Sequence, residues 1–320
     1  MNEFKSPIGP INIGVPQGSV LGPLFFNVFI NDIASSFNVN CKLFADDAVL
    51  YVSRSSYDEA CDYISELAVN LSRWLLKNRL VAHTDKTKLM LFTPRPVYFL
   101  RDITFNGKVL EWVDDFKYLG LTIDNKFSFN KHINYVCQGL SKSHGVLRAL
   151  SSVLPFPSLR TLFYSLSLSK LSNTLLIWGG VPFNSKKRVV TLINKTLRTI
   201  FRVRYDENHI PLTRTNVLYK QSKILKLDDM YKFQLLKFMN RALFHDERLF
   251  NSAFASLVPQ HSHNTRGMRF NLPPVRLEIE RNGTVFNCVK YFNELPDDFK
   301  IDCSKFVLKT KFRDFILTQY

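Results

Sequence analysis

Two adjacent acids interrupt an apolar run early in the chain, and they restrict the local fold more than any other feature. The run Leu43-Phe44-Ala45-Asp46-Asp47 is followed closely by Val49-Leu50-Tyr51-Val52. Apolar and β-branched residues on both sides of a short acidic break are typical of a strand, a tight turn and a second strand. We therefore predict a hairpin that holds both carboxylates at its tip.

Two carboxylates at one turn indicate a specific chemistry. Neighbouring carboxylates repel each other, so ionising both has an energetic cost that a bound divalent cation relieves. Hard oxygen ligands suit Mg²⁺, which binds through few carboxylates together with substrate phosphates. Two such ions about 4 Å apart stabilise the attacking and leaving oxygens of phosphoryl transfer. The alternative is that Asp46-Asp47 is only a turn, because aspartate favours turns in many proteins.

A glycine-rich segment precedes the acid pair. The run Gly14-Val15-Pro16-Gln17-Gly18-Ser19-Val20-Leu21-Gly22-Pro23 places three glycines and two prolines around one glutamine. Glycine permits close backbone approach to a ligand, and Gln17 offers donor and acceptor groups to a nucleotide. The run is not a P-loop, because no Gly-Lys-Ser/Thr ends it, and it is not a hydrolase elbow, because Ser19 lacks a glycine two residues before it. An ordinary strand-to-helix loop is the alternative.

Residue periodicity predicts an α/β segment followed by a helical one. We expect helices at 23–33, with Leu24, Phe25, Val28 and Phe29 on one apolar face, and at 57–78. A strand is expected at 88–92, and Asn106-Gly107 predicts a second hairpin, because both residues tolerate positive φ. From about residue 129 to 244 the pattern is helical, and the region from 255 onward is mixed.

Residues 14–25 and Phe44-Ala45-Asp46-Asp47 resemble the nucleotide loop and metal-binding hairpin of reverse transcriptases. The closest resemblance is to the non-LTR (LINE-type, jockey-like) retrotransposon group. It implies an α+β fold: a partial palm of antiparallel strands on helices at 1–128, a helical thumb and basic region at 129–254, and a mixed C-terminal region at 255–320. It also implies an RNA-directed DNA polymerase that adds dNTPs to the 3′ end of a DNA primer on an RNA template, with a two-ion Mg²⁺ site.

The resemblance also assigns roles to individual residues. Asp46 and Asp47 become catalytic metal ligands, and Lys86 lies near the leaving pyrophosphate, although the family usually has Asn-Pro-Ser where this chain has His83-Thr84-Asp85. A solvated strand-end lysine is the alternative for Lys86. The resemblance assigns substrate binding to Gly14, Pro16, Gln17, Gly18, Ser19, Phe44 and Ala45. The run Phe116-Lys117-Tyr118-Leu119-Gly120 resembles the primer grip, which would use Tyr118, Leu119 and Gly120.

The distribution of charge indicates a polyanionic partner. The chain has a net charge of +16, and residues 121–240 hold 19 basic and 5 acidic residues. In a predicted helix at 186–204, Arg188, Lys195 and Arg202 recur every seven residues with Arg198 beside them. Such a stripe can neutralise nucleic-acid phosphates, and its binding would weaken with salt. A solvated face of an amphipathic helix is the alternative.

One element of the resembling family is missing. Palms of this family use three carboxylates, and the third lies on a strand upstream of the glycine-rich segment. Only 13 residues precede Gly14, and their one acid is Glu3. We therefore expect little or no polymerase activity from this polypeptide alone. The alternatives are a non-catalytic nucleic-acid-binding protein derived from a retroelement and a non-functional remnant.

The remaining features exclude other classes of protein. Five scattered cysteines, an odd number, indicate a reduced intracellular protein, with nucleus and cytoplasm not distinguished. The residues His261, His263, Cys288 and Cys303 fit no zinc-binding spacing. The apolar stretch 162–181 contains Lys170 and Asn173, so we predict a buried helix rather than a membrane span.

Overall fold

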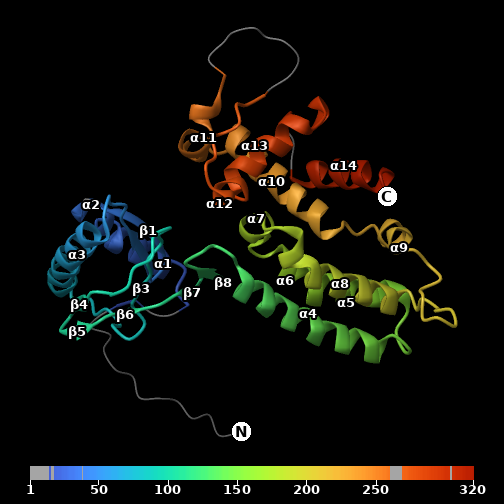
Figure 1. Cartoon of the computed structure of the whole chain (residues 1–320), viewed down its shortest axis with the longest axis horizontal. Coiled ribbons are helices and arrows are strands. Elements are labelled where there is room, and N and C mark those ends of the chain that lie inside the picture. Colours follow the sequence, from blue (N-terminus) through green and yellow to red (C-terminus); the bar gives the residue numbers. More distant parts are fainter. Residues whose placement is uncertain (1–13, 16–17, 38, 260–268, 303–304) are drawn as a thin grey trace, which may run out of the picture. The chain divides into compact units, whose positions relative to one another are not determined.

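The chain forms two compact units, Met1–Val113 and Asp114–Tyr320, shown in Figure 1. The computed structural model describes residues 14–15, 18–37, 39–259, 269–302 and 305–320. Unit 1 combines helices with short β-ladders, and unit 2 is mainly helical, so the predicted α+β class is confirmed. In the described ranges, no helix has both the length and the apolar character needed to cross a bilayer.

The described part of unit 1 contains three helices, two β-hairpins and one parallel strand pair. The helices are α1 (Gly22–Ile30), α2 (Ile33–Ser36) and α3 (Tyr57–Lys77). The antiparallel pairs are β1 (Asn40–Phe44) with β2 (Asp47–Tyr51) and β4 (Thr104–Phe105) with β5 (Lys108–Val109). Strand β3 (Lys88–Leu89) pairs in parallel with β6 (Glu111–Trp112). The strand predicted at 88–92 is therefore shorter, since β6 offers only two residues for pairing.

The core of unit 1 lies between α3 and the second hairpin. Cys61 and Ala68 on one face of α3 pack with Ile103, Phe105 and Leu110. The predicted Asn-Gly turn is confirmed, with φ of 49° at Asn106 and 76° at Gly107. Helix α3 begins at the predicted residue because the Ser56 hydroxyl accepts a hydrogen bond from the Glu59 amide at 3.2 Å.

Helix α1 differs from the prediction in length and in exposure. It ends at Ile30, and the two residues after it separate it from α2. Its expected apolar face, Leu24, Phe25, Val28 and Phe29, is 45–70% exposed. The described residues therefore do not cover this face.

Unit 2 begins with a hairpin and continues as helices. The hairpin consists of β7 (Asp115–Tyr118) and β8 (Leu121–Asp124). The main helices are α4 (Asn130–Leu150), α5 (Phe156–Phe163), α8 (Phe183–Ile200), α9 (Thr215–Ser222), α10 (Leu227–Phe244), α11 (Glu247–Ala253), α13 (Thr284–Glu294) and α14 (Lys305–Thr318). Shorter helical segments are the π-helix η1 (Tyr164–Leu168), the α-helices α6 (Ser169–Ser172), α7 (Leu175–Trp178) and α12 (Glu278–Arg281), and the 3₁₀ helices η2 (Ala255–Leu257) and η3 (Asp297–Phe299).

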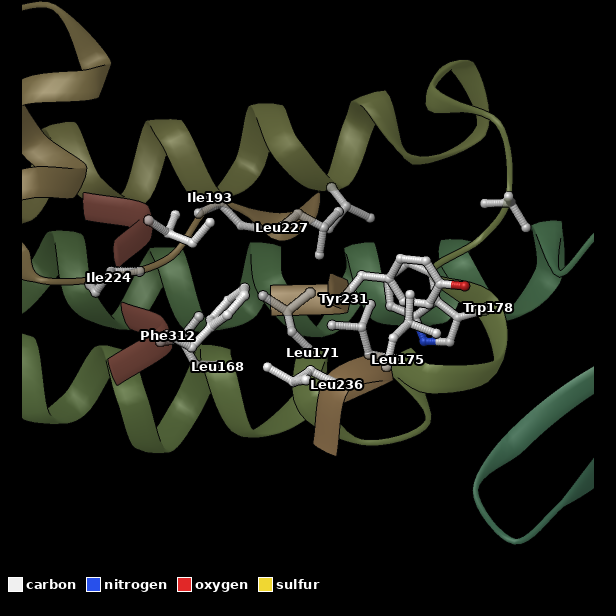
Figure 2. Packing of buried hydrophobic residues seen from close by; sticks show 14 of the residues in the cluster. Leu168, Leu171, Leu175, Trp178, Ile193, Ile224, Leu227, Tyr231, Leu236 and Phe312 are labelled. Carbon is white, nitrogen blue, oxygen red and sulfur yellow. The ribbon is translucent and has the colours of Figure 1, made fainter. Parts of the chain in front are cut away.

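The apolar stretch 162–181 contributes one side to the core, but it is not the single buried helix that was predicted. Figure 2 shows Leu171, Leu175 and Trp178 from this stretch in the core beside Tyr231 of α10. The stretch breaks after α6 because Asn173 is extended and Thr174 has a φ of 60°. The break sets α7 apart from α6, and Leu171, Leu175 and Trp178 are all fully buried.

Candidate functional site

The acid pair lies at the tip of the predicted hairpin. Strands β1 and β2 pair in antiparallel register, with Phe44 opposite Asp47, so Ala45 and Asp46 form a two-residue turn. Ala45 has a φ of 52°. A left-handed conformation costs a residue with a Cβ atom about 1–2 kcal/mol.

Both carboxylates of this turn are open to solvent. Asp46 and Asp47 are exposed, and neither carboxylate forms an ion pair with any residue that the structure describes. The adjacent Phe44 is 61% exposed, although it lies on a strand. The described residues hold no group of three or more His, Cys, Asp or Glu side chains that could bind a metal. The turn therefore presents two unpaired oxygen ligands.

The free state of Asp46-Asp47 distinguishes it from three other Asp-Asp pairs in the chain. In each of the others, at least one carboxylate is bonded to a neighbouring side chain. The pairings are Asp114 with Asn125 at 2.9 Å, Asp115 with Lys131, Asp228 with Lys186 at 2.7 Å, Asp229 with Tyr320 at 2.6 Å, and Asp297 with Lys300 at 3.0 Å. The same dipeptide is thus structural at three places and unpaired at one.

The glycine-rich segment is described in part. Gly14 and Gly18 have φ of 85° and 86°, and a Cβ atom added to either would meet nothing within 4 Å. Glycine is therefore needed there for conformation and not for space. The Ser19 hydroxyl accepts a hydrogen bond from the Gly22 amide at 3.0 Å, at the start of α1. Pro16 and Gln17 lie outside the described residues.

Lys86 lies in the turn that precedes β3. It is exposed, and its amide donates to the His83 carbonyl at 3.0 Å. Two nearby lysines are neutralised: Lys88 by Glu111 at 2.5 Å and Lys108 by Asp85. Lys86 has no ion pair with a described residue, so its charge is available to a ligand.

The hairpin that resembles a primer grip belongs to unit 2. Tyr118 pairs with Leu121, and the turn between them has φ of 47° at Leu119 and 84° at Gly120. Leu121 is 3% exposed and contributes to the helical core, whereas Leu119 at the tip is 44% exposed. The turn is thus exposed at Leu119, while Leu121, directly after the turn, packs into the helical core.

A buried histidine, His132, attaches this hairpin to the helices, although no site role was predicted for it. The Thr122 amide donates to His132 Nδ1 at 3.4 Å, and His132 Nε2 lies 3.2 Å from the Thr174 hydroxyl. That hydroxyl donates to the Asn173 carbonyl at 2.6 Å, so Nε2 carries the proton and donates. Burial lowers the pKa of His132, and the charge of Lys117 lowers it further. The network therefore requires the neutral imidazole.

Asp124 provides a second attachment between the hairpin and α4. Its carboxylate accepts hydrogen bonds from the backbone amides of Phe129 at 2.7 Å, Ser128 at 2.9 Å and Lys126 at 3.2 Å. These amides belong to the connection before α4 and to its N-cap, which would otherwise lack acceptors. The hairpin and the first turn of α4 are thereby fixed together.

Of the four basic residues in the predicted stripe, two lie exposed on α8 and two are hydrogen-bonded to neighbouring elements. Arg188 and Lys195 are exposed on α8. Arg198 donates to the Thr215 hydroxyl at 3.0 Å, and Arg202, beyond the end of α8, donates to the carbonyls of Ser151 at 2.8 Å and Leu154 at 3.1 Å. Helices α4 and α8 lie side by side (Figure 1), so these contacts join neighbouring elements. Arg188 and Lys195 keep their charge available to a partner.

Of the four His and Cys residues considered for zinc, only Cys288 is described. It is 1% exposed, and burial raises the pKa of its thiol. The positions 261, 263 and 303 lie outside the described ranges.

Comparison with known protein families gives a match in the N-terminal part of the chain. The family model described as "Reverse transcriptase (RNA-dependent DNA polymerase)" matches residues 8–123. This range includes the glycine-rich segment, the Asp46-Asp47 turn, Lys86 and the hairpin tip at Leu119. No solved structure gives a significant match.

The similar curated proteins specify the group. The RNA-directed DNA polymerase from mobile element jockey of Drosophila melanogaster is 25% identical over 84% of this chain and 30% of its own length. The probable polymerases from transposon X-element and transposon BS of the same organism are 26% and 28% identical, over 77% and 62% of this chain. The match spans less than a third of the length of each of these three relatives. These matches confirm the resemblance to non-LTR retrotransposon reverse transcriptases.

Proposed function

We propose that the chain is part of an RNA-directed DNA polymerase that adds dNTPs to a DNA primer on an RNA template. The observation that carries the proposal is the Asp46-Asp47 turn. It is the one Asp-Asp pair whose two carboxylates are both unpaired among the described residues, and it lies in the segment matched by the reverse transcriptase family. Unpaired carboxylates side by side at a strained turn fit the oxygen donor set that Mg²⁺ prefers.

Each part of the site has a proposed task. Asp46 and Asp47 would hold Mg²⁺, which supplies charge stabilisation for phosphoryl transfer when bound. Lys86 would meet the charge of the leaving pyrophosphate. The substrate-binding set is Gly14, Pro16, Gln17, Gly18, Ser19, Phe44 and Ala45, and the primer-supporting set is Tyr118, Leu119 and Gly120. In this proposal unit 1 supplies palm elements, and α4 with α8 supply the thumb.

We propose that these 320 residues do not extend a primer by themselves. Two carboxylates from one turn are one fewer than the family's site uses, and no third acid joins them among the described residues. A two-ion site with one ligand missing binds metal more weakly and places the ions less accurately.

Primer extension tests both parts of this proposal. The chain alone should give no Mg²⁺-dependent extension on an RNA template. A chimera that joins the preceding polymerase segment of the jockey relative to residue 14 should extend the primer, and Asp46→Asn should abolish that extension. Asp298→Asn is the matched control, because it alters another Asp-Asp pair. Extension by the chain alone, or a chimera indifferent to Asp46→Asn, would contradict the proposal.

A second candidate function is non-catalytic nucleic-acid binding. The exposed charges of Arg188 and Lys195 on α8 favour it, together with the net charge of the chain. Duplex binding should weaken with salt, and the double variant Arg188→Ala/Lys195→Ala should reduce the slope of log K against log [salt] by about 2. Affinity independent of salt would contradict this function. An intracellular location is part of both proposals, and Cys41, Cys61, Cys137 and Cys288 are free thiols.

A further inference from the structure

The connection between α8 and α9 contains a built hairpin, which we call the 204–212 hairpin. Its two arms join where the Leu212 amide donates to the Arg204 carbonyl at 3.0 Å and Tyr205 forms an antiparallel bridge with Pro211. Inside it, the Asp206 carboxylate accepts from the Asn208 amide at 3.0 Å and the Ile210 amide at 2.7 Å. These hydrogen bonds give the loop a hairpin structure of its own.

The base of this hairpin is attached to the helical body. Arg202 donates from Nε to the Ser151 carbonyl at 2.8 Å, in the turn between α4 and α5. The ring of Phe201 lies 4.7 Å from that of Phe156, measured between centroids. Figure 1 shows the connection, in yellow, extending from the end of α8 before the chain returns to α9. The hairpin is held in place at its base and extends into solvent.

The hairpin exposes the side chains that a loop would normally bury. Tyr205 is 50% exposed, Ile210 58% and Leu212 66%, and Arg204 is exposed beside them. Ordering a loop costs conformational entropy, and burial of these side chains within the chain does not offset that cost. Clustered exposed apolar and aromatic side chains on an ordered scaffold are typical of a binding surface.

The charge around the hairpin selects a polyanionic partner. Residues 186–226 contain 11 basic and 2 acidic residues. Both acids, Asp206 and Glu207, lie in the hairpin itself: the Asp206 carboxylate accepts from the hairpin's own amides, and Glu207 is exposed. An exposed aromatic ring among cations fits a nucleic-acid strand with unpaired bases, because the ring stacks on a base while arginine contacts phosphate.

We propose that the 204–212 hairpin binds unpaired RNA, with Tyr205 stacking on a base and Arg204 contacting the adjacent phosphate. The choice of RNA rests on the proposed function, in which the partner is an RNA template. The contact itself does not involve the Asp46-Asp47 turn or Mg²⁺. It is therefore a second nucleic-acid surface, separate in its chemistry from the site of nucleotide addition.

Binding of the full chain to a fluorescent, unstructured 20-nucleotide RNA tests this proposal in EDTA. Tyr205→Ala should weaken binding about 5- to 160-fold, and Tyr205→Phe should retain it, because base stacking needs the ring and not the hydroxyl. Arg204→Ala should lower the slope of log K against log [salt] by about 0.7. Controls are Tyr98→Ala, which removes an 84% exposed tyrosine in unit 1, and Arg276→Ala, which removes an exposed arginine.

Two further arms separate the possible outcomes. Photocrosslinking of the unaltered chain to the RNA should give adducts within 204–212, which makes the result independent of variant folding. Duplex RNA should bind more weakly and respond less to Tyr205→Ala, because its bases are already stacked on one another. RNA affinity unchanged by Tyr205→Ala, or crosslinks only elsewhere, would overturn the proposal. Because no metal is present, failure of the polymerase proposal appears separately, in primer extension with Asp46→Asn.

Discussion

Replacing His132 by phenylalanine tests how the β7–β8 hairpin is held against the helices. His132→Phe keeps a ring near Trp178, whose centroid lies 6.0 Å away, but it removes the acceptor of the Thr122 amide. An amide left without a partner costs about 1–3 kcal/mol, and the long 3.4 Å bond favours the lower end. At pH 8 we expect the free energy of unfolding of unit 2 to fall by about 1 kcal/mol.

The same substitution should change the pH dependence of stability. Because burial lowers the pKa of His132, this side chain takes up a proton below about pH 6.5 in the unfolded chain but stays neutral at that pH in the folded chain. Stability from the neutral imidazole is therefore complete above that pH and is lost as the pH falls. Between pH 7.5 and 5.5, the unaltered chain should lose up to about 1.4 kcal/mol more than His132→Phe. His144 is also buried with a lowered pKa, but it is present in both the unaltered chain and His132→Phe, so its effect on the pH dependence of stability is the same in both.

Urea unfolding followed by tryptophan fluorescence makes this measurement. Replacing Trp74 and Trp112 by phenylalanine removes the two tryptophans of unit 1 and leaves Trp178 as the reporter of unit 2. Equal loss of stability by both proteins between pH 7.5 and 5.5 would refute the reasoning. So would an NMR titration that gives His132 a pKa at or above 6.5.

Two further substitutions test the packing of unit 2 with the same reporter. Gly180→Ala should lower the free energy of unfolding of unit 2 by about 1–3 kcal/mol, because the new Cβ atom would lie 2.2 Å from the Asn282 carbonyl oxygen. An unchanged urea midpoint would show that this contact relaxes freely. Leu159→Ala, at a fully buried position, should lower the free energy of unfolding by about 2–5 kcal/mol. Val153→Ala, at a 76% exposed position, should change it by no more than about 0.5 kcal/mol. Similar losses of stability at both positions would contradict the burial described above.

Local features of the fold follow from the sequence where short-range chemistry decides them. The turn at Asn106-Gly107 lies where predicted, and the first hairpin turns at Ala45-Asp46, one residue before the predicted Asp46-Asp47. A short polar break between strand-forming residues leaves the chain few other conformations. Helix α3 starts at Tyr57 because Ser56 caps it. The stretch 162–181 shows the limit: its contribution to the core follows from composition, but its break at Thr174 depends on packing against other elements.

In the candidate site, too, some features follow from the local sequence and others depend on the tertiary fold. A dipeptide cannot reveal that Asp46-Asp47 is unpaired while Asp297 is bonded to Lys300, because those partners are set by the fold. The role of His132 depends on Thr174, 42 residues away, which no local pattern indicates. The seven-residue spacing of basic residues predicts one stripe on α8. The structure instead uses Arg202 to hold the α4–α5 turn, because α8 ends before it.

Binding of Mn²⁺, as a paramagnetic substitute for Mg²⁺, tests the central claim most directly. Water-proton relaxation should detect Mn²⁺ bound to the full chain, with affinity reduced at least about tenfold by Asp46→Asn or Asp47→Asn, since each removes half of the ligand set. Asp298→Asn should leave the affinity unchanged, because that acid pair lies elsewhere and Asp297 beside it is bonded to Lys300. Equal Mn²⁺ affinity in all four proteins would contradict the assignment of the Asp46-Asp47 turn as the metal-binding turn of a polymerase.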